Sequence, residues 1–151
     1  MNKQKTLMLM LISFFMISAG MIFLSEDPIP EGNRATINAN IMEHSDGTWR
    51  VKDNNGNITA TIVAAKADNI NFRVIGSDAI FSFPEGFDIH KHFIVPEGVF
   101  VNTRNHRLSA NQTLRLDVRP DAPAVQTNYD VYVLRDSKYV IGNSPPVLII
   151  R

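Results

Sequence analysis

Two histidines separated by a single residue are the part of the sequence with the clearest capacity for chemistry. His90 and His92 lie in residues 89–95 (IHKHFIV), whose β-branched and aromatic side chains predict a strand. Side chains two residues apart in a strand share a face, so both imidazoles would present a nitrogen to one copper or zinc ion. His44 or His106 is the candidate for a third ligand, which the spacing of the pair does not supply.

The same alternation also allows a plainer interpretation of these histidines. The other face of the strand would carry Ile89, Lys91, Phe93 and Val95. That face is mostly apolar and therefore suited to a core. The histidines would then be solvated side chains on the polar face, without a ligand. The sequence leaves the metal site and the solvated pair both open.

No other arrangement of side chains points to catalysis. Asp117, Asp121 and Asp130 are carboxylates without the D-x-D-x-D-G loop of a calcium site, and alternation turns Asp117 toward solvent. Ser77 and Ser144 stand in turn sequence and lack the G-x-S-x-G context of a hydrolase nucleophile. The sequence therefore predicts a non-enzymatic protein with no cofactor.

The charge and the cysteine content exclude several functional classes. The 151 residues include 15 basic and 15 acidic side chains, so the formal net charge is zero. Nucleic-acid binding normally requires clustered Lys and Arg, and it is not expected here. The chain has no cysteine, which excludes disulfides, zinc–thiolate sites, iron–sulfur clusters and blue-copper centres.

A hydrophobic segment near the N-terminus predicts attachment to a membrane. The run from Leu7 to Leu24 is uncharged, and as a helix it would be about 27 Å long, close to the thickness of the hydrocarbon core. Lys3 and Lys5 precede this run, and acidic residues follow it. By the positive-inside rule, the N-terminus stays in the cytoplasm and the remainder is exported. This predicts a single-pass protein of the inner (cytoplasmic) membrane with a periplasmic or extracellular domain.

The same segment also fits a cleaved signal peptide. Ile17-Ser18-Ala19 has the small residues of a signal-peptidase site, and cleavage after Ala19 would release a secreted protein. Residues 25–33 (SEDPIPEGN) are rich in proline and acids and predict an extended linker. The expected organisation is an anchor or signal segment over residues 1–25, a linker over 26–34 and a folded domain over 35–151.

The exported domain is expected to be all-β. In residues 35–42, Ile37, Ala39 and Ile41 alternate with polar residues, which is the period of a half-buried strand. Turn signals separate the further strands predicted at residues 49–51, 58–64, 70–75, 79–83, 89–95, 113–118, 129–134, 138–141 and 147–151. Such a series indicates an immunoglobulin-like or cupredoxin-like β-sandwich, here preceded by one transmembrane helix.

Two connections affect how these strands would pair. Asn and Gly tolerate positive φ, so residues 53–57 (DNNGN) predict a hairpin between the strands on either side of them. Residues 100–112 are the least regular part of the domain and predict a long loop or one poor strand around residues 99–101.

The last predicted strand has consequences for assembly. Residues 147–151 (VLIIR) are apolar on both faces of the strand. Such a strand is either central in its sheet or covered by a partner, and at an edge it would pair with another chain. The second alternative would favour self-association or a larger membrane complex.

The aromatic side chains offer stacking surfaces for sugars or proteins only where they are exposed. Strand positions favour core packing for most of Trp49, Phe72, Phe81, Phe83, Phe93, Tyr129 and Tyr132. Phe87 and Phe100 lie in loop-like sequence and are expected to be partly exposed. Carbohydrate binding is therefore a third possibility, with no motif in its favour.

One segment of the domain is similar to a known family. Residues 69–83 (NINFRVIGSDAIFSF) resemble the first core segment of a cupredoxin, most of all in the periplasmic domain of cytochrome c oxidase subunit II. In that family, a strand F-x-V leads through a turn to D-x-I-H-S-F, and the domain follows an N-terminal membrane anchor. The resemblance implies a cupredoxin-like sandwich in which residues 129–133 form the strand before the ligand loop.

The copper ligands of that family are absent from this chain. Phe81 stands at the position of the first histidine ligand, and the loop that should carry the cysteines reads Arg135-Asp136-Ser137-Lys138. A copper centre of the family type is therefore excluded.

The function expected from the sequence combines these observations. We expect a membrane-tethered, extracytoplasmic β-sandwich that acts as a non-enzymatic interaction or accessory module, binding a protein partner or a second copy of itself. The alternative is a cupredoxin-like module that binds copper or zinc through His90 and His92.

Overall fold

The computed structural model describes residues 34–96, 99–100, 104–141 and 146–151. The chain divides into two compact units, Met1–Gly32 and Asn33–Arg151, and the described residues belong to the second. The predicted anchor from Leu7 to Leu24 and the cleavage site after Ala19 lie outside the described residues. No helix within the described ranges is long and apolar enough to cross a membrane.

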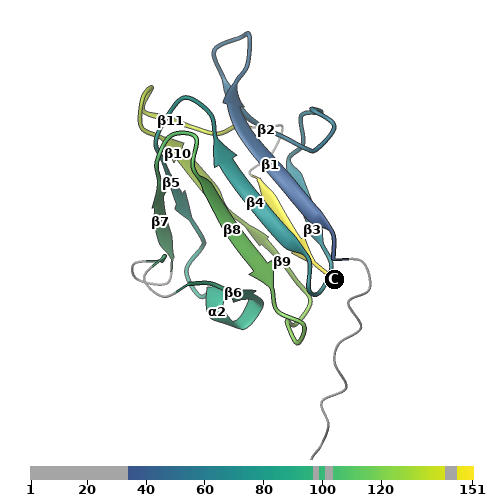
Figure 1. Ribbon diagram of the computed structural model, residues 1–151. Helices are drawn as coiled ribbons and strands as arrows, with labels where there is room; N and C mark the ends of the chain where they lie inside the picture. Colours follow the sequence, from purple (N-terminus) through teal and green to yellow (C-terminus); the bar gives the residue numbers. More distant parts are fainter. Residues whose placement is uncertain (1–33, 97–98, 101–103, 142–145) are drawn as a thin grey trace, which may run out of the picture. The chain divides into compact units, whose positions relative to one another are not determined.

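Five strands form the first sheet, in the order β2-β1-β4-β8-β6. Their bounds are β1 Thr36–Glu43, β2 Trp49–Lys52, β4 Asn69–Val74, β6 Phe93–Ile94 and β8 Thr113–Val118. β1 and β4 pair in parallel, and the other pairs are antiparallel. Figure 1 shows β1, β4 and β8 side by side at the front of the domain.

The remaining strands form two groups, in the orders β11-β10-β5-β7 and β3-β12-β9. Their bounds are β3 Thr61–Ala64, β5 Ala79–Ser82, β7 Asn105–Leu108, β9 Val125–Asn128, β10 Asp130–Val133, β11 Lys138–Tyr139 and β12 Val147–Ile150. Only Tyr129 separates β9 from β10, and the alternation of buried and exposed side chains continues through it. The two groups are therefore continuous, and we call them together the second layer; it lies behind the first sheet (Figure 1).

The core fills the space between the two layers. Ile41, Phe72 and Leu116 of the first sheet are fully buried, as are Phe81 and Leu148 of the second layer. Alternate residues of each strand point inward, so each strand contributes one apolar face to this core. The prediction of a mostly β fold is confirmed, and its several sheets are consistent with a β-sandwich.

The strand predicted at residues 89–95 is wrong over its first half. The structure has the short helix α2, Ile89–His92, followed by the two-residue strand β6. The side chain of Asp88 accepts a hydrogen bond from the backbone N–H of His90, and the N–H of Phe93 bonds to the carbonyl of Ile89. This N-cap satisfies backbone groups that in a strand would form hydrogen bonds with a neighbouring strand. It therefore stabilises a helical turn at this point.

The turn predicted at residues 53–57 is present, but the strand after it does not form the predicted hairpin with the strand before it. The Asp53 carboxylate accepts hydrogen bonds from the N–H groups of Asn55 and Asn57, and Gly56 has a φ of 81°. After one bridge between Lys52 and Ile58, the chain crosses to the second layer. There β3 pairs in parallel with β12, which gives the buried alternate residues of β3 their place in the core.

Two strands lie in sequence that does not predict them. β7 occupies part of the region expected to be a loop, and it pairs with β5 at the edge of the second layer. β9 has the sequence VQTN, with one buried side chain, and it pairs with β12. β12 is therefore central in its group, between β3 and β9, which confirms one of the two alternatives for residues 147–151.

Candidate functional site

The geometry expected for the paired histidines is not found. In a helix, successive side chains are about 100° apart, so His90 and His92 point in nearly opposite directions. His90 is exposed, whereas His92 is buried and stacks on Phe87 with a ring-centroid distance of 4.8 Å. Burial lowers the pKa of His92, and a hydrogen bond to the backbone of Pro123 opposes this shift only in part. The shared face on which the metal hypothesis depends is therefore absent.

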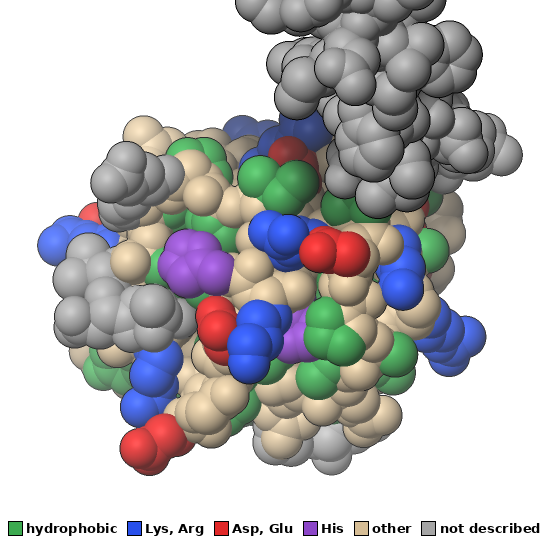
Figure 2. Space-filling view, turned by 90° about the horizontal axis from the view of Figure 1, so that it is seen from below, with side chains coloured by type: hydrophobic (Ala, Val, Ile, Leu, Met, Phe, Trp, Pro, Cys, Tyr) green, Lys and Arg blue, Asp and Glu red, His purple; other side chains and the backbone are tan. Residues whose placement is uncertain are grey.

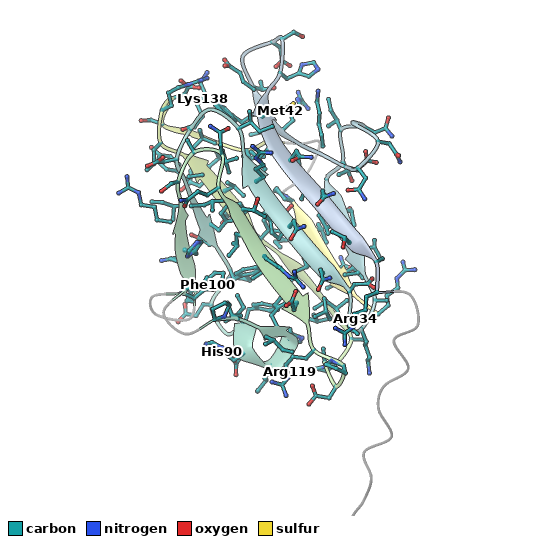
Figure 3. All side chains as sticks on the ribbon, viewed as in Figure 1. Arg34, Met42, His90, Phe100, Arg119 and Lys138 are labelled. Carbon is teal, nitrogen blue, oxygen red and sulfur yellow. The ribbon has the colours of Figure 1, made fainter. Side chains whose placement is uncertain are left out.

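The other two histidines lie on other elements, and the ring of His106 in β7 packs against Phe100 with centroids 5.4 Å apart. His44 follows β1 and contacts Ser45 and Asp46. Its neighbour Met42 lies at the upper end of Figure 3, and His90 at the lower end. Among the described residues, no group of three or more His, Cys, Asp or Glu side chains could hold a metal ion.

At the end of the domain that carries α2, the described residues do not form a patch of a single charge. In Figure 2, which is seen from that end, acidic, basic and histidine side chains are interspersed. Arg119 and Asp121 make an ion pair of 2.9 Å in this part of the chain, so their charges compensate each other.

The serine and aspartate candidates from the sequence have structural partners. The Ser77 hydroxyl donates to the carbonyl of Asp78 at 2.8 Å and accepts from the N–H of Arg135 at 3.1 Å. Asp117 pairs with Arg115 at 2.6 Å on the outer face of β8, as the alternation predicts. Ser144 lies outside the described residues.

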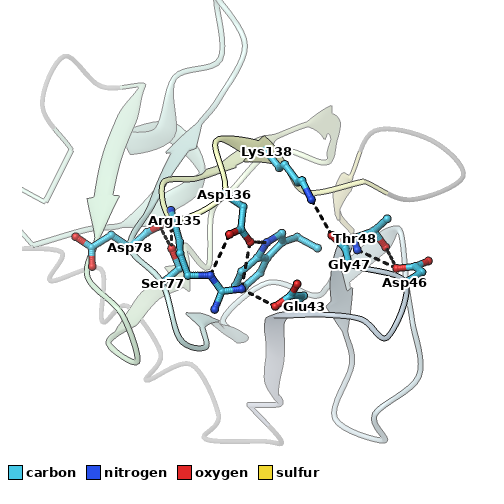
Figure 4. A network of polar contacts seen from close by, with 10 residues as sticks. Glu43, Asp46, Gly47, Thr48, Ser77, Asp78, Arg135, Asp136 and Lys138 are labelled. Carbon is cyan, nitrogen blue, oxygen red and sulfur yellow. Dashed lines mark hydrogen bonds and ion pairs between the residues drawn. The ribbon is translucent and has the colours of Figure 1, made fainter.

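A polar network joins the turn between β10 and β11 to the first sheet (Figure 4). The indole Nε1 of Trp49 donates to Asp136 at 2.7 Å, and the guanidinium of Arg135 lies 5.0 Å from the centre of the Trp49 ring. Arg135 also pairs with Asp136 at 3.1 Å and with Glu43 at 2.5 Å. This arrangement holds the two layers together, and each charge in it has a partner.

Most of the aromatic residues pack in the core as predicted. Phe100 is also buried, contrary to expectation, because its ring packs against Phe83 with centroids 6.0 Å apart. Tyr132 is the exception in the other direction: it is half-buried and faces outward. It meets the exposed Tyr139 edge to face, with ring centroids 5.0 Å apart.

The outer face of the first sheet is polar. Apart from Met42 and Ile94, the outward side chains of its five strands are all polar or charged. They are Thr36, Asn38, Asn40, Arg50, Lys52, Asn69, Asn71, Arg73, Thr113, Arg115 and Asp117. This face has the composition of an ordinary solvated surface.

The outer face of the second layer is different in composition. Its outward side chains include six that are apolar or aromatic: Val63, Ile80, Tyr132, Tyr139, Val147 and Ile149. Val63 and Tyr139 are 42% and 59% exposed. Large apolar and aromatic side chains gathered on one exposed face mark a binding surface more often than a solvated one.

The strand register places these side chains in rows. Ile80, Tyr132 and Tyr139 lie opposite one another across β5, β10 and β11. Ile149 lies opposite Val63 in β3 and forms a second row. At about 3.3 Å per residue along the continuous strands β9 and β10, this second row is about 20 Å from the first. Asp130 and its neighbours form a polar strip between these two rows.

A hollow of about 220 Å³ opens on this face. It is lined by Ile80, Ser82, Asp130, Tyr132 and Tyr139, and we call it the tyrosine pocket. Its walls combine two aromatic rings, one aliphatic side chain, a hydroxyl and a carboxylate. The pocket is therefore equipped to hold a group that is both partly apolar and polar or charged.

The sequence contains a signal for this pocket that is easily missed. In β10 (DVYV), Val131 and Val133 are buried, so Asp130 and Tyr132 must face outward. The aromatic character of Tyr132 favours a core position, and the alternation argues against it. Tyr139 joins the pocket only through the pairing of β10 with β11, which the sequence does not specify.

No protein-family model matches this chain, and no curated protein sequence matches it either.

Proposed function

We propose that this chain is a non-enzymatic interaction module that binds a protein partner through the outer face of its second layer. The observation that carries this proposal is the difference between the two outer faces. One is polar throughout most of its strands, and the other presents six apolar or aromatic side chains, five of which lie in two rows across the strands. Two solvated faces would be expected to have similar compositions. The outer face of the second layer therefore has the composition of a surface that a partner covers.

The composition of this face fits a protein interface. Tyrosine is enriched in the buried centre of protein interfaces, and polar residues surround it. Here the row of Ile80, Tyr132 and Tyr139 is continued by the exposed Arg107 of β7, which lies opposite Ile80, and Asn105 of β7 is exposed as well. A protein partner would cover the apolar rows and leave this polar margin in contact with water.

The C-terminal strand supports binding through the face and not through an edge. β12 is flanked on both sides, so its backbone groups are already paired with β3 and β9. Its outward residues Val147 and Ile149 nevertheless remain apolar and only half-buried. A partner lying on the face would bury them without any change in strand pairing.

The location of the module is part of the proposal. The uncharged run from Leu7 to Leu24 supports a single-pass anchor in the inner membrane, with the domain on the periplasmic or extracellular side. Cleavage after Ala19 would instead give a secreted protein. The immunoglobulin-like or cupredoxin-like topology is likewise proposed, on the basis of the two-layer arrangement and the sequence of residues 69–83.

Site-specific photocrosslinking tests the binding face. A photoreactive benzoylphenylalanine is introduced at Ile149 or Tyr139 in the full chain, and at Asn71 on the opposite face as the control. Irradiation of membranes should give a protein adduct of defined mass from Ile149 and Tyr139 and none from Asn71. Equal adducts from both faces, or no adduct from Ile149 and Tyr139, would contradict the proposal.

A further inference from the structure

We propose that the tyrosine pocket receives the side chain of a lysine or arginine of the partner protein. This inference rests on the proposed function, because it names the group that the partner would insert into this face. The chemistry of the pocket supports a cation more than a neutral group, for two independent reasons.

The first reason is an uncompensated carboxylate. Asp130 lines the pocket, and among the described residues its side chain has neither a hydrogen bond nor an ion pair. The exposed loop residue Glu85 is the one other described carboxylate with this property. The remaining carboxylates all accept a hydrogen bond or form an ion pair. A negative charge without a partner on a strand in the middle of a layer is suited to a cation from outside.

The second reason is the aromatic pair beside that carboxylate. Tyr132 and Tyr139 meet at an interplanar angle of 64° with ring centroids 5.0 Å apart, and both residues line the hollow. The face of an aromatic ring is electronegative and attracts a cation that lies within about 6 Å of its centre. Ile80 supplies an aliphatic surface on which the methylene groups of a lysine or arginine would lie.

A second copy of this chain is a weaker candidate for the occupant. Arg107 is an outward cation close to the pocket, because it lies opposite Ile80 in β7. Its guanidinium is already 2.8 Å from the carboxylate of Asp78. A dimer that placed Arg107 in the pocket of the partner copy would have to break this ion pair.

A sugar would use the same tyrosines in a different way. A pyranose ring stacks on an aromatic face, and its hydroxyls bond to acids and amides alike. The substitution Asp130→Asn keeps the shape and the hydrogen-bonding capacity of the side chain and removes its charge. It therefore distinguishes a cation, which depends on the charge, from a sugar, which does not.

The experiment uses the full chain in membranes with the photoreactive residue at Tyr139, which retains an aromatic ring there. The adduct is digested, and the crosslinked peptide of the partner is sequenced. It should contain a lysine or arginine beside the crosslinked position. Asp130→Asn should lower the adduct yield about tenfold, and the matched control Glu85→Gln, which neutralises the other unpaired carboxylate outside the pocket, should change it less than about twofold. Exchanging the charges, with Asp130→Lys and an acid in place of the partner's base, should restore the yield.

Each contrary outcome has a separate meaning. An adduct that Asp130→Asn leaves unchanged, a crosslinked peptide without a base, an adduct to a glycan or an adduct to a second copy would overturn the inference. An adduct at Ile149 without one at Tyr139 would also overturn it and leave the proposed function standing. No adduct at either position would overturn both. Unchanged thermal unfolding of Asp130→Asn shows that a lost adduct does not reflect a lost fold.

Discussion

The indole Nε1 of Trp49 donates a hydrogen bond of 2.7 Å to the carboxylate of Asp136, although the two residues are 87 positions apart in the chain. Trp49 begins β2 in the first sheet, and Asp136 lies in the turn that follows β10 in the second layer. Trp49 is fully buried, so this bond reaches from the core to the surface and connects the two layers at one end of the domain.

We predict that Asp136→Asn lowers the thermal unfolding temperature at neutral pH. Hydrogen bonds from Arg135 and then from Trp49 hold the pKa of Asp136 below its ordinary value of 3.8. A lowered pKa stabilises the folded state above pH 3.8, and this contribution disappears as the pH falls through the pKa of the folded state. The difference between the variant and the parent should therefore be largest near pH 7 and should shrink below about pH 4.

The control for this prediction is Asp121→Asn. Asp121 also has a lowered pKa, but its ion pair with Arg119 is exposed and joins residues of the same turn. Exposed pairs contribute little to stability, so this variant should unfold close to the parent temperature. Equal effects of the two substitutions would contradict a special role for the bond between Trp49 and Asp136.

Stability should also depend on pH through His92. Burial keeps the folded-state pKa of His92 below 6.5, so the unfolded chain takes up a proton at a higher pH than the folded chain does. Folding is then favoured above about pH 6.5, and stability is lost as the pH falls below that value. Denaturant titrations at pH 7.5 and pH 5 should show this loss.

Replacement of His92 should remove that pH dependence. His92→Phe keeps an aromatic ring stacked on Phe87 and has no titratable group. Its stability should change less between pH 7.5 and pH 5 than that of the parent. The exposed His90, replaced by Gln, serves as the comparison and should leave the parent dependence in place.

Tyr129→Phe should be neutral or stabilising. The Tyr129 hydroxyl is buried and has no hydrogen-bond partner among the described residues. Burial also raises the pKa of this phenol, so it stays protonated. An unsatisfied buried polar group costs about 1–3 kcal/mol, and its removal should raise the free energy of unfolding by up to about 1 kcal/mol.

The companion variant for Tyr129 tests the ring itself. The ring packs edge to face against Phe72, with centroids 5.3 Å apart. Tyr129→Ala should therefore lower the free energy of unfolding by about 3–5 kcal/mol in urea titrations. A large destabilisation by Tyr129→Phe would show that the hydroxyl has a partner.

Metal binding should not depend on the two adjacent histidines. Because His90 is exposed and His92 is buried on another side of α2, the two do not converge on one ion. Titration of the full chain with copper or zinc should give the same result for the parent and for the variant His90→Ala plus His92→Ala. Binding tighter than about 10 μM that is lost in this variant would restore the metal hypothesis.

The regular strands could be predicted from the sequence because their signal is local. The alternation at residues 113–118 gives β8 with the same bounds, and residues 35–42 give β1 within one position at each end. Inward and outward positions follow from the same alternation, since successive side chains of a strand point to opposite faces. β9 could not be predicted from alternation, because its sequence VQTN has little apolar character. Its position depends on its pairing with β12.

The histidine pair shows where local reasoning fails. Residues 89–95 have the composition of a strand, yet the carboxylate of Asp88 caps a helical turn and reverses the direction of His92. A run of a few apolar residues fits both a short strand and a helical turn, and the surrounding fold decides between them. The proposed metal geometry depended on this choice.

The sequence by itself determined that the domain is β-rich and which side chains of most strands face inward. Only the tertiary structure decided which strands are neighbours, and so it alone brought Tyr139 beside Tyr132 and Ile149 beside Val63. The physical reason is that strands pair through backbone hydrogen bonds, which are the same for nearly every residue type. Side-chain alternation fixes the face of a residue, whereas its neighbours across the sheet depend on how the whole core packs.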